Sequence, residues 1–350
     1  MIVLATGASV NLVLEPIYSQ AVWGAGWYNA AEAAHYADNA IRYEGNIDIE
    51  LQMGAAGAFW NFLADFVVSA RAYPRSLEIS PDGSHVYKYL TTGAYNVNYD
   101  TNGAWCSSAN FSTSEGSFIT CSIGVVAISR TENDPTGSGV NYSAYSYIKQ
   151  STGIIASSCT ALSPTNPLNP GGDNVDPIPY WRSNAQLGHG TYPGAFGTVT
   201  LPQAGTETVD WSIDVSNNQK ILYTCSGSRL PRAVLMGPMS VGGNVTLYHP
   251  NGVFDPILGP AGTGSLTEPY STAENTWFQV AINYGAGTTY VEIPAAVIEG
   301  DDYSIQGADS ITNRAFTLKG MGGRCNSSAI LPPCIISTYA GALPAVGAPP

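Results

Sequence analysis

Charged residues are scarce in this 350-residue chain, and the two signs are unequally represented. They make up 11% of the sequence, against about 25% in a typical soluble domain. Lys and Arg together number 13, against 26 Asp and Glu, so the formal net charge is −13. Proteins that bind nucleic-acid phosphates need clustered cations. The small number of Lys and Arg residues therefore argues against nucleic-acid binding. A surface with so little charge is usually covered by something: a partner subunit, a bilayer or a cell wall.

Long apolar runs are absent too. A membrane-spanning helix needs about 18 or more consecutive apolar residues, and the most apolar stretch, residues 54–70, is interrupted by Asn61 and Asp65. The opening residues, Met1 to Ser9, contain no Lys or Arg, so no secretion signal is predicted. We therefore expect no membrane contact.

Motifs that carry chemistry are also missing. The six cysteines form no CxxC pair and no Cys/His spacing suited to zinc, so neither a metal nor a cofactor is expected. Their even number leaves disulfides and buried free thiols both open. The four histidines are widely spaced, and the chain has no Gly-x-Ser-x-Gly elbow, phosphate loop or His-Glu-x-x-His element. We expect no catalytic residue and no enzymatic activity.

What the sequence does contain is strand patterning. Hydrophobic residues supply 44% of the chain, enough for buried cores. Short β-branched or alternating runs separated by Gly, Asn, Asp and Pro are typical of strands and turns. These runs are residues 46–51, 117–128, 209–215, 244–248, 276–284 and 288–293. The predicted fold class is therefore mainly β.

One amphipathic helix is expected near residues 55–71. Phe59, Phe62, Leu63 and Phe66 recur at the spacing that places side chains on one face of a helix. Pro74 keeps the helix from running much further. We expect this apolar stripe to lie against a sheet.

Composition divides the chain into two halves. A change to Ser, Thr, Pro, Gly and Asn after residue 150 is typical of a linker. We predict a first domain over residues 1–150, a linker over 151–175, a second domain over 176–325 and a C-terminal extension over 326–350.

The two halves share a weak internal repeat. The strand that begins at Ser9-Val-Asn-Leu runs to Tyr18, and after a connection of about twenty residues the opening Gly45-Asn-Ile follows. In the second half, a strand that begins at Ser212-Ile-Asp-Val leads to Tyr223, and Gly243-Asn-Val follows. Order and spacing agree well enough to propose a duplicated domain.

The second half resembles the tail tube proteins, or major tail proteins, of long-tailed bacteriophages. The matching segments are Trp211-Ser-Ile-Asp-Val, Ser226-Gly-Ser-Arg-Leu-Pro, Val241-Gly-Gly-Asn-Val-Thr-Leu, Tyr290-Val-Glu-Ile-Pro and Asp309-Ser-Ile-Thr-Asn-Arg. The first half shows the same order in residues 45–51, 59–66 and 111–128. The second half departs from the pattern after Tyr248, where Pro250, Pro256 and Pro260 replace the helix.

The resemblance implies two tandem β-sandwich or barrel domains, each contributing strands to a β-barrel formed between subunits. It implies a structural subunit that assembles into stacked rings and conducts DNA during ejection. Single-domain members form hexameric rings, so a fused pair implies trimeric, pseudo-hexameric rings, with hexameric rings of whole chains as the alternative. The implied partners are a tape measure protein and tail terminator or tip proteins, and the implied location is the virion after assembly in the host cytoplasm.

Two groups of side chains are candidates for roles in such a tube. Asp48 and Glu50 recur at period two and share one strand face, so we interpret them as lumen-facing acids rather than catalytic or calcium-binding carboxylates. The aromatic residues Trp23, Trp27 and Tyr28 are interpreted as interface anchors, although such residues could also stack sugars or bases. The alternative function is a secreted or cell-surface β-sandwich that binds carbohydrate or acts as an adhesin.

Overall fold

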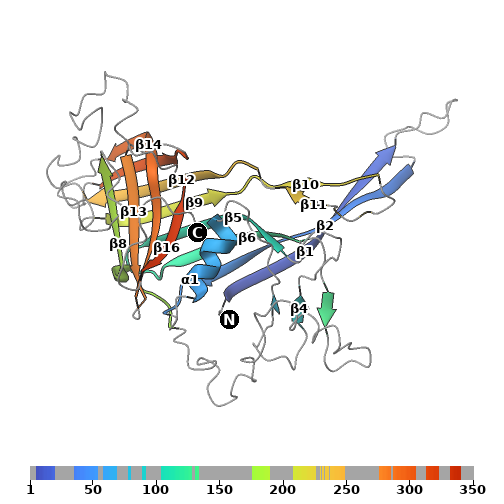
Figure 1. Ribbon diagram of the computed structural model, residues 1–350, viewed down its shortest axis with the longest axis horizontal. Coiled ribbons are helices and arrows are strands. Elements are labelled where there is room, and N and C mark those ends of the chain that lie inside the picture. Colours follow the sequence, from blue (N-terminus) through green and yellow to red (C-terminus); the bar gives the residue numbers. More distant parts are fainter. Residues whose placement is uncertain are drawn as a thin grey trace, which may run out of the picture.

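The computed structural model describes seventeen short or long stretches of the chain. These are residues 5–19, 35–53, 58–68, 78–79, 89–91, 104–127, 131–133, 176–189, 208–225, 229, 231, 233–235, 237–248, 276–284, 287–304, 313–322 and 332–339. They confirm a mainly β fold (Figure 1). The predicted linker over residues 151–175 lies outside the described residues.

Strands account for most of the described chain. In the first half they are β1 (Ala5–Ser19), β2 (His35–Glu50), β3 (Glu78–Ile79), β4 (Tyr89–Thr91), β5 (Ala104–Ser114), β6 (Thr120–Ala127) and β7 (Thr131–Asn133). In the second half they are β8 (Ser183–His189), β9 (Thr208–Ser216), β10 (Lys220–Leu222), β11 (Ala233–Leu235), β12 (Ser240–Tyr248), β13 (Thr276–Asn283), β14 (Thr288–Ser304), β15 (Asn313–Gly320) and β16 (Ile335–Tyr339). Each run predicted as a strand falls on one of these elements.

The predicted helix is present but short. It consists of α1 (Ala58–Leu63), followed directly by the π-helical turn η1 (Ala64–Val68). Trp60, Leu63 and Phe66 are buried, whereas Phe62 is only half-buried and stacks on Phe66 with ring centroids 5.2 Å apart. The expected apolar stripe is therefore confirmed, except that Trp60 rather than Phe62 is a fully buried member. A separate 3₁₀ turn, η3 (Tyr180–Arg182), precedes β8.

One continuous sheet runs through both halves. Its order is β1-β2-β6-β5-β9-β12-β15-β14-β13-β8, with β16 added beside β14, and all these neighbours pair antiparallel. Two small sheets, β10-β11 and β3-β4-β7, stand apart from it. The halves meet where β5 pairs with β9, from Ser108 opposite Ser216 to Ser114 opposite Asp210. We call this contact the β5–β9 seam.

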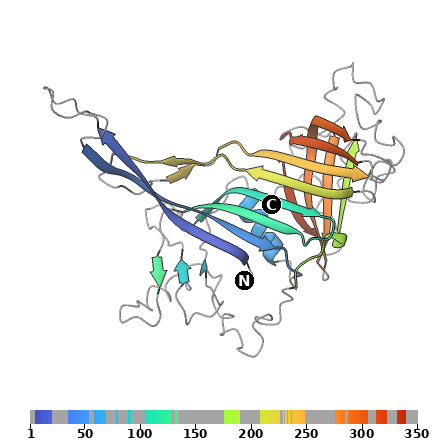
Figure 2. The same ribbon diagram turned by 180° about the vertical axis from the view of Figure 1, so that it is seen from behind.

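The long strand β14 belongs to two layers. Its first part pairs with β13 and β16, and its second part, from Ala296 to Ser304, pairs with β15. Figures 1 and 2 show β8, β13 and the first part of β14 crossing steeply over the direction of β9 and β12. The core lies between these layers and includes α1, where Trp60 contacts Tyr284 with ring centroids 6.3 Å apart. Within residues 326–350, predicted as a C-terminal extension, β16 pairs with β14 of the same chain.

A four-strand unit occurs twice in this sheet. The order β1-β2-β6-β5 in the first half is followed by β9-β12-β15-β14 in the second, so both units place their strands in the chain order first, second, fourth, third. Within each unit all pairs are antiparallel. Figures 1 and 2 show the two units side by side as one curved layer.

The residue register of the two units also coincides. Ser9 lies opposite Asn46 in the first unit, and Ser212 lies opposite Asn244 in the second. This register agrees with the repeat seen in the sequence at these positions, but it does not align the two tyrosines, because Tyr18 corresponds to Ile221. The correspondence continues past the end of β9. Ile17 pairs with Ala37 in the β1–β2 pair, and at the equivalent position Lys220 pairs with Leu235 in the β10–β11 pair.

Two β-bulges recur at matching positions. In the first-to-second strand pairs, the extra residue is Thr6 in β1 and Val209 in β9. In the third-to-fourth strand pairs, the extra residue is Ser107 in β5 and Glu299 in β14. Bulges bend and twist a sheet locally, so both units curve at the same places. Residue equivalence between the units can therefore be read strand by strand.

Candidate functional site

The two faces of the repeated units differ sharply in chemistry. Successive strand residues point to opposite faces, and in β9 the buried residues Trp211, Ile213 and Val215 alternate with Asp210, Ser212 and Asp214. The face that carries the second set is called the polar face. Its other members are Asn46, Asp48 and Glu50 of β2, Ser122 of β6, Ser108, Asn110 and Ser112 of β5, Gly242, Asn244 and Thr246 of β12, and Thr317 and Lys319 of β15.

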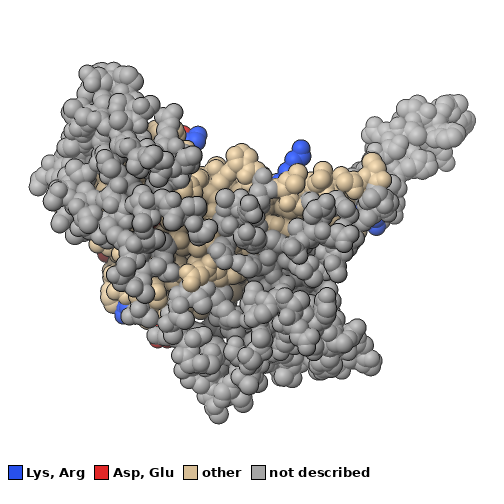
Figure 3. All heavy atoms as spheres, in the orientation of Figure 1, with Lys and Arg blue, Asp and Glu red and all other residues tan. Residues whose placement is uncertain are grey.

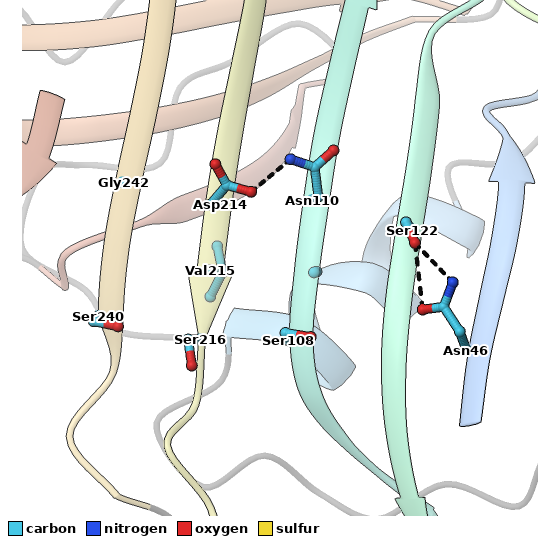
Figure 4. Close-up of a pocket in the computed structure, with 10 residues that line it drawn as sticks. Asn46, Ser108, Asn110, Ser122, Asp214, Val215, Ser216, Ser240 and Gly242 are labelled. Atoms are coloured by element: carbon cyan, nitrogen blue, oxygen red, sulfur yellow. Dashed lines mark hydrogen bonds between the residues drawn. The ribbon is translucent and has the colours of Figure 1, made fainter. Parts of the chain in front are cut away.

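A shallow hollow of about 270 Å³ lies on the polar face across the β5–β9 seam (Figure 4). On one side of it, the Asn110 amide donates to a carboxylate oxygen of Asp214 at 2.5 Å. On the other, Asn46 and Ser122 contact each other, with the Asn46 amide nitrogen 2.9 Å from Ser122 Oγ. The hollow is thus lined by small polar groups that already bond with one another.

The predicted acids Asp48 and Glu50 lie on the polar face of β2 and are half-buried. The carboxylate of Asp48 accepts hydrogen bonds from the Asn46 amide and the Ser122 hydroxyl, both at 2.6 Å. Both residues therefore lie on the same face of the strand.

Carboxylates outnumber cations on this face. Asp210 and Asp214 join Asp48 and Glu50 there, while Lys319 is an exposed cation on β15. Arg42 is paired with Glu44 on the same strand, with Arg42 Nε 2.5 Å from Glu44 Oε1. In the space-filling view, the described surface is mainly uncharged, with isolated basic side chains (Figure 3).

The adjacent acids Asp301 and Asp302 do not share one face of the sheet. As neighbours in β14 they point to opposite faces. Asp301 is held by Arg314, whose Nε and Nη2 donate to its two carboxylate oxygens at 2.7 and 2.6 Å. Among the described residues, no group of three or more His, Cys, Asp or Glu side chains is placed to hold a metal ion.

Trp23, Trp27 and Tyr28 lie outside the described residues. Sequence reasoning missed Asn110 and Asp214, although the alternation Ser108-Ala-Asn-Phe-Ser-Thr-Ser was a usable signal for a strand with one polar face. In the part of the chain that the structure describes, no helix is long and apolar enough to cross a membrane.

Comparisons with known proteins give little beyond this geometry. No family model and no curated protein matches the chain. Among solved structures, the chain is similar to the SPP1 tail tube determined by solid-state NMR and cryo-EM. The identity is 16% and the TM-score 0.26, over 47% of this chain and 80% of that one.

Proposed function

We propose that the chain is a non-enzymatic structural subunit of a bacteriophage tail tube, with two fused tube domains. The observation that carries the proposal is the four-strand unit that occurs twice, in one register, within a single continuous sheet. Strands of further copies can add to the two ends of this sheet. Because exposed sheet edges are a liability, closing the copies into a ring would remove them. The sequence resemblance to tail tube proteins favours the same assembly.

Three copies would close one ring. Each chain supplies two units, so three chains supply the six that a hexameric ring of single-domain subunits contains. The two units are joined covalently within a chain and by pairing between chains, which gives threefold rings of pseudo-sixfold appearance. Rings of six whole chains, with only one half of each lining the channel, are the alternative arrangement.

The polar face suits the channel wall. Much of the opposite face is covered by α1 and by the layer that contains β13 and β16, so the polar face is the better candidate for the wall of a water-filled lumen. Its surplus of carboxylates would repel DNA phosphates over the Debye length, about 8–10 Å at physiological salt. DNA would then pass without specific binding.

The same assembly defines the expected partners and location. Stacked rings would form around a tape measure protein and end at terminator and tip proteins, so the chain would reside in the virion after assembly in the host cytoplasm. DNA ejection through the tube is the function that this arrangement would serve.

Electron microscopy of the purified full-length protein tests the proposal. We expect rings or hollow cylinders whose averaged end views show threefold symmetry. Sixfold symmetry would replace the trimer by the hexamer of whole chains, and a protein that stays globular at every concentration would contradict the tube and favour the adhesin. Broad hydrolase assays are expected to be blank, and turnover abolished by one Asp, Glu or His substitution would contradict the non-enzymatic role.

A further inference from the structure

The repeated sheet ends in two strands that each keep one edge without a partner strand among the described residues. β1 pairs with β2 along one edge only. In β14, residues 297–304 pair with β15 on one side, whereas pairing with β13 on the other side ends at Ala296. The free edges therefore belong to β1, at one end of the first unit, and to β14, at the far end of the second unit.

The chain also contains one completed junction between these same two kinds of strand. At the β5–β9 seam, β5, the strand at the end of the first unit, pairs with β9, the strand that begins the second. By the register of the units, β5 corresponds to β14, because the bulge residues Ser107 and Glu299 match. β9 corresponds to β1 in the same way, because the bulge residues Val209 and Thr6 match.

We propose that β14 of one copy pairs antiparallel with β1 of a second copy, in the register of the β5–β9 seam. Transferring Ser108 opposite Ser216 and Asn110 opposite Asp214 gives Gly300 opposite Val13 and Asp302 opposite Asn11 of the second copy. Ser304 then lies opposite Ser9. This pairing rests on the proposed function for its ring but specifies the contact residue by residue.

The polar chemistry of the transferred pairing is complementary. At the seam within the chain, the Asn110 amide donates to Asp214 at 2.5 Å. At the corresponding place between copies, Asp302 stands where Asn110 stood and Asn11 stands where Asp214 stood. One amide still meets one carboxylate, with the two strands exchanging roles. Both side chains are exposed in the single chain.

The apolar side of β1 points to the same partner. In the repeat, Leu12 corresponds to Val215 and Leu14 corresponds to Asn217. Val215 and Asn217 are buried beneath the seam, at 2% and 1% exposure. Leu12 and Leu14 are instead 44% and 51% exposed. A second copy seated on the β1 edge would cover these two leucines as the first unit covers β9.

Cysteine crosslinking of full-length assemblies tests the register. Directly opposite residues in an antiparallel pair have Cα atoms about 4.5–5.5 Å apart, within the range for a disulfide. We therefore expect Asn11→Cys with Asp302→Cys, and Ser9→Cys with Ser304→Cys, to link chains on mild oxidation. The control, Ser9→Cys with Asp302→Cys, is two residues out of register and about 8 Å apart, so about tenfold less product is expected. Linked peptides are identified by mass spectrometry because native cysteines are present.

The outcomes separate this inference from the proposed function. Crosslinks at both matched pairs and not at the control support the register. Rings or cylinders by microscopy, with linkage at the control pair or at none, would overturn the register and leave the tube standing. A protein that stays monomeric at all concentrations would overturn both.

A charge exchange gives a second readout on the same contact. Asn11→Asp alone sets two carboxylates opposite each other and should raise the concentration needed for assembly roughly fivefold. Adding Asp302→Asn restores one amide and one carboxylate, in the orientation of Asn110 and Asp214, and should return assembly to the original value. Unchanged thermal unfolding of each variant shows that the fold is intact, and a double variant that assembles no better than Asn11→Asp would contradict the pairing.

Discussion

The side-chain amide of Asn217 donates to the backbone carbonyl of Val67 at 3.1 Å. The same nitrogen lies 3.0 Å from the carbonyl of Cys106, and the backbone N–H of Asn217 donates to Ser107 at 2.9 Å. Asn217 directly follows β9, Val67 belongs to η1 and Cys106 to β5. One side chain of the second half thus joins η1 and β5 of the first half, beneath the β5–β9 seam.

Asn217→Ala should destabilise the chain. The substitution leaves the carbonyl of Val67 without this donor in a buried place, which typically costs about 1–3 kcal/mol of unfolding free energy, whereas the Cys106 carbonyl keeps the Gln219 amide at 2.6 Å. Urea unfolding measures the loss as a lower midpoint with an unchanged slope. Asn244→Ala is the control, because Asn244 is exposed and its bond to Ser212 is long at 3.4 Å. Equal losses in the two variants would contradict the role of Asn217.

A second prediction concerns Arg314 and Asp301. Arg314 is 7% exposed, donates twice to Asp301 and lies over the Phe316 ring at 5.2 Å. Asp301→Asn removes the opposing charge, and we expect a loss of about 1–3 kcal/mol, since hydrogen bonds between charged groups are worth about that much. Glu299→Gln is the matched control, because its partner Lys319 is exposed and such pairs contribute about 0–1 kcal/mol. A larger loss for Glu299→Gln would contradict this ranking.

The cysteines should differ in reactivity. Burial raises the pKa of the Cys106 thiol and of the Cys334 thiol to about 12, and burial also raises the pKa of Cys121 well above its usual value. Because only the thiolate reacts, these three should resist alkylation at pH 8 in the folded protein, while exposed Cys225 should be modified. Peptide mapping after alkylation, with and without urea, checks this. Rapid labelling of Cys106 in the folded protein would contradict its burial.

Secondary structure was largely predictable because periodicity reports it directly. Residues 276–284 read as a strand and form β13, and the stripe from Phe59 to Phe66 reads as a helix and forms α1 with η1. The helical spacing nonetheless predicted Phe62 rather than Trp60 as a buried member of the stripe. Spacing alone cannot say which flank of a helix meets the sheet and the ring of Tyr284.

Pairing between distant strands was not predictable in the same way. Alternation shows which face a residue occupies, but not which strand lies beside it. Nothing in the sequence singles out Asn110 as the partner of Asp214, or Arg314 as the partner of Asp301. Ser9 and Ser212 were recognised as equivalent because each begins an alternating run that is followed, further along the chain, by a Gly-Asn pair. The bulges at Ser107 and Glu299, which establish the equivalence of β5 and β14, carry no sequence signature that one chain reveals.

The last prediction tests the proposed channel wall through Glu50. Glu50 lies on the polar face at the end of β2, and the proposed threefold ring would hold three copies of it. Wild-type cylinders should retain little DNA even at low salt, because carboxylates prevail on that face. Glu50→Lys would add three cations to each ring, so DNA binding should appear at 50 mM salt. Because binding then depends on counterion release, the affinity should weaken by roughly tenfold or more at 200 mM salt. Glu115→Lys makes the same charge change in the turn between β5 and β6, outside the strands that carry the polar face, and serves as the control. Fluorescence anisotropy with short labelled DNA measures both variants, after microscopy confirms that each still forms cylinders. Equal gains from the two substitutions would mean that the polar face is not where DNA meets the protein.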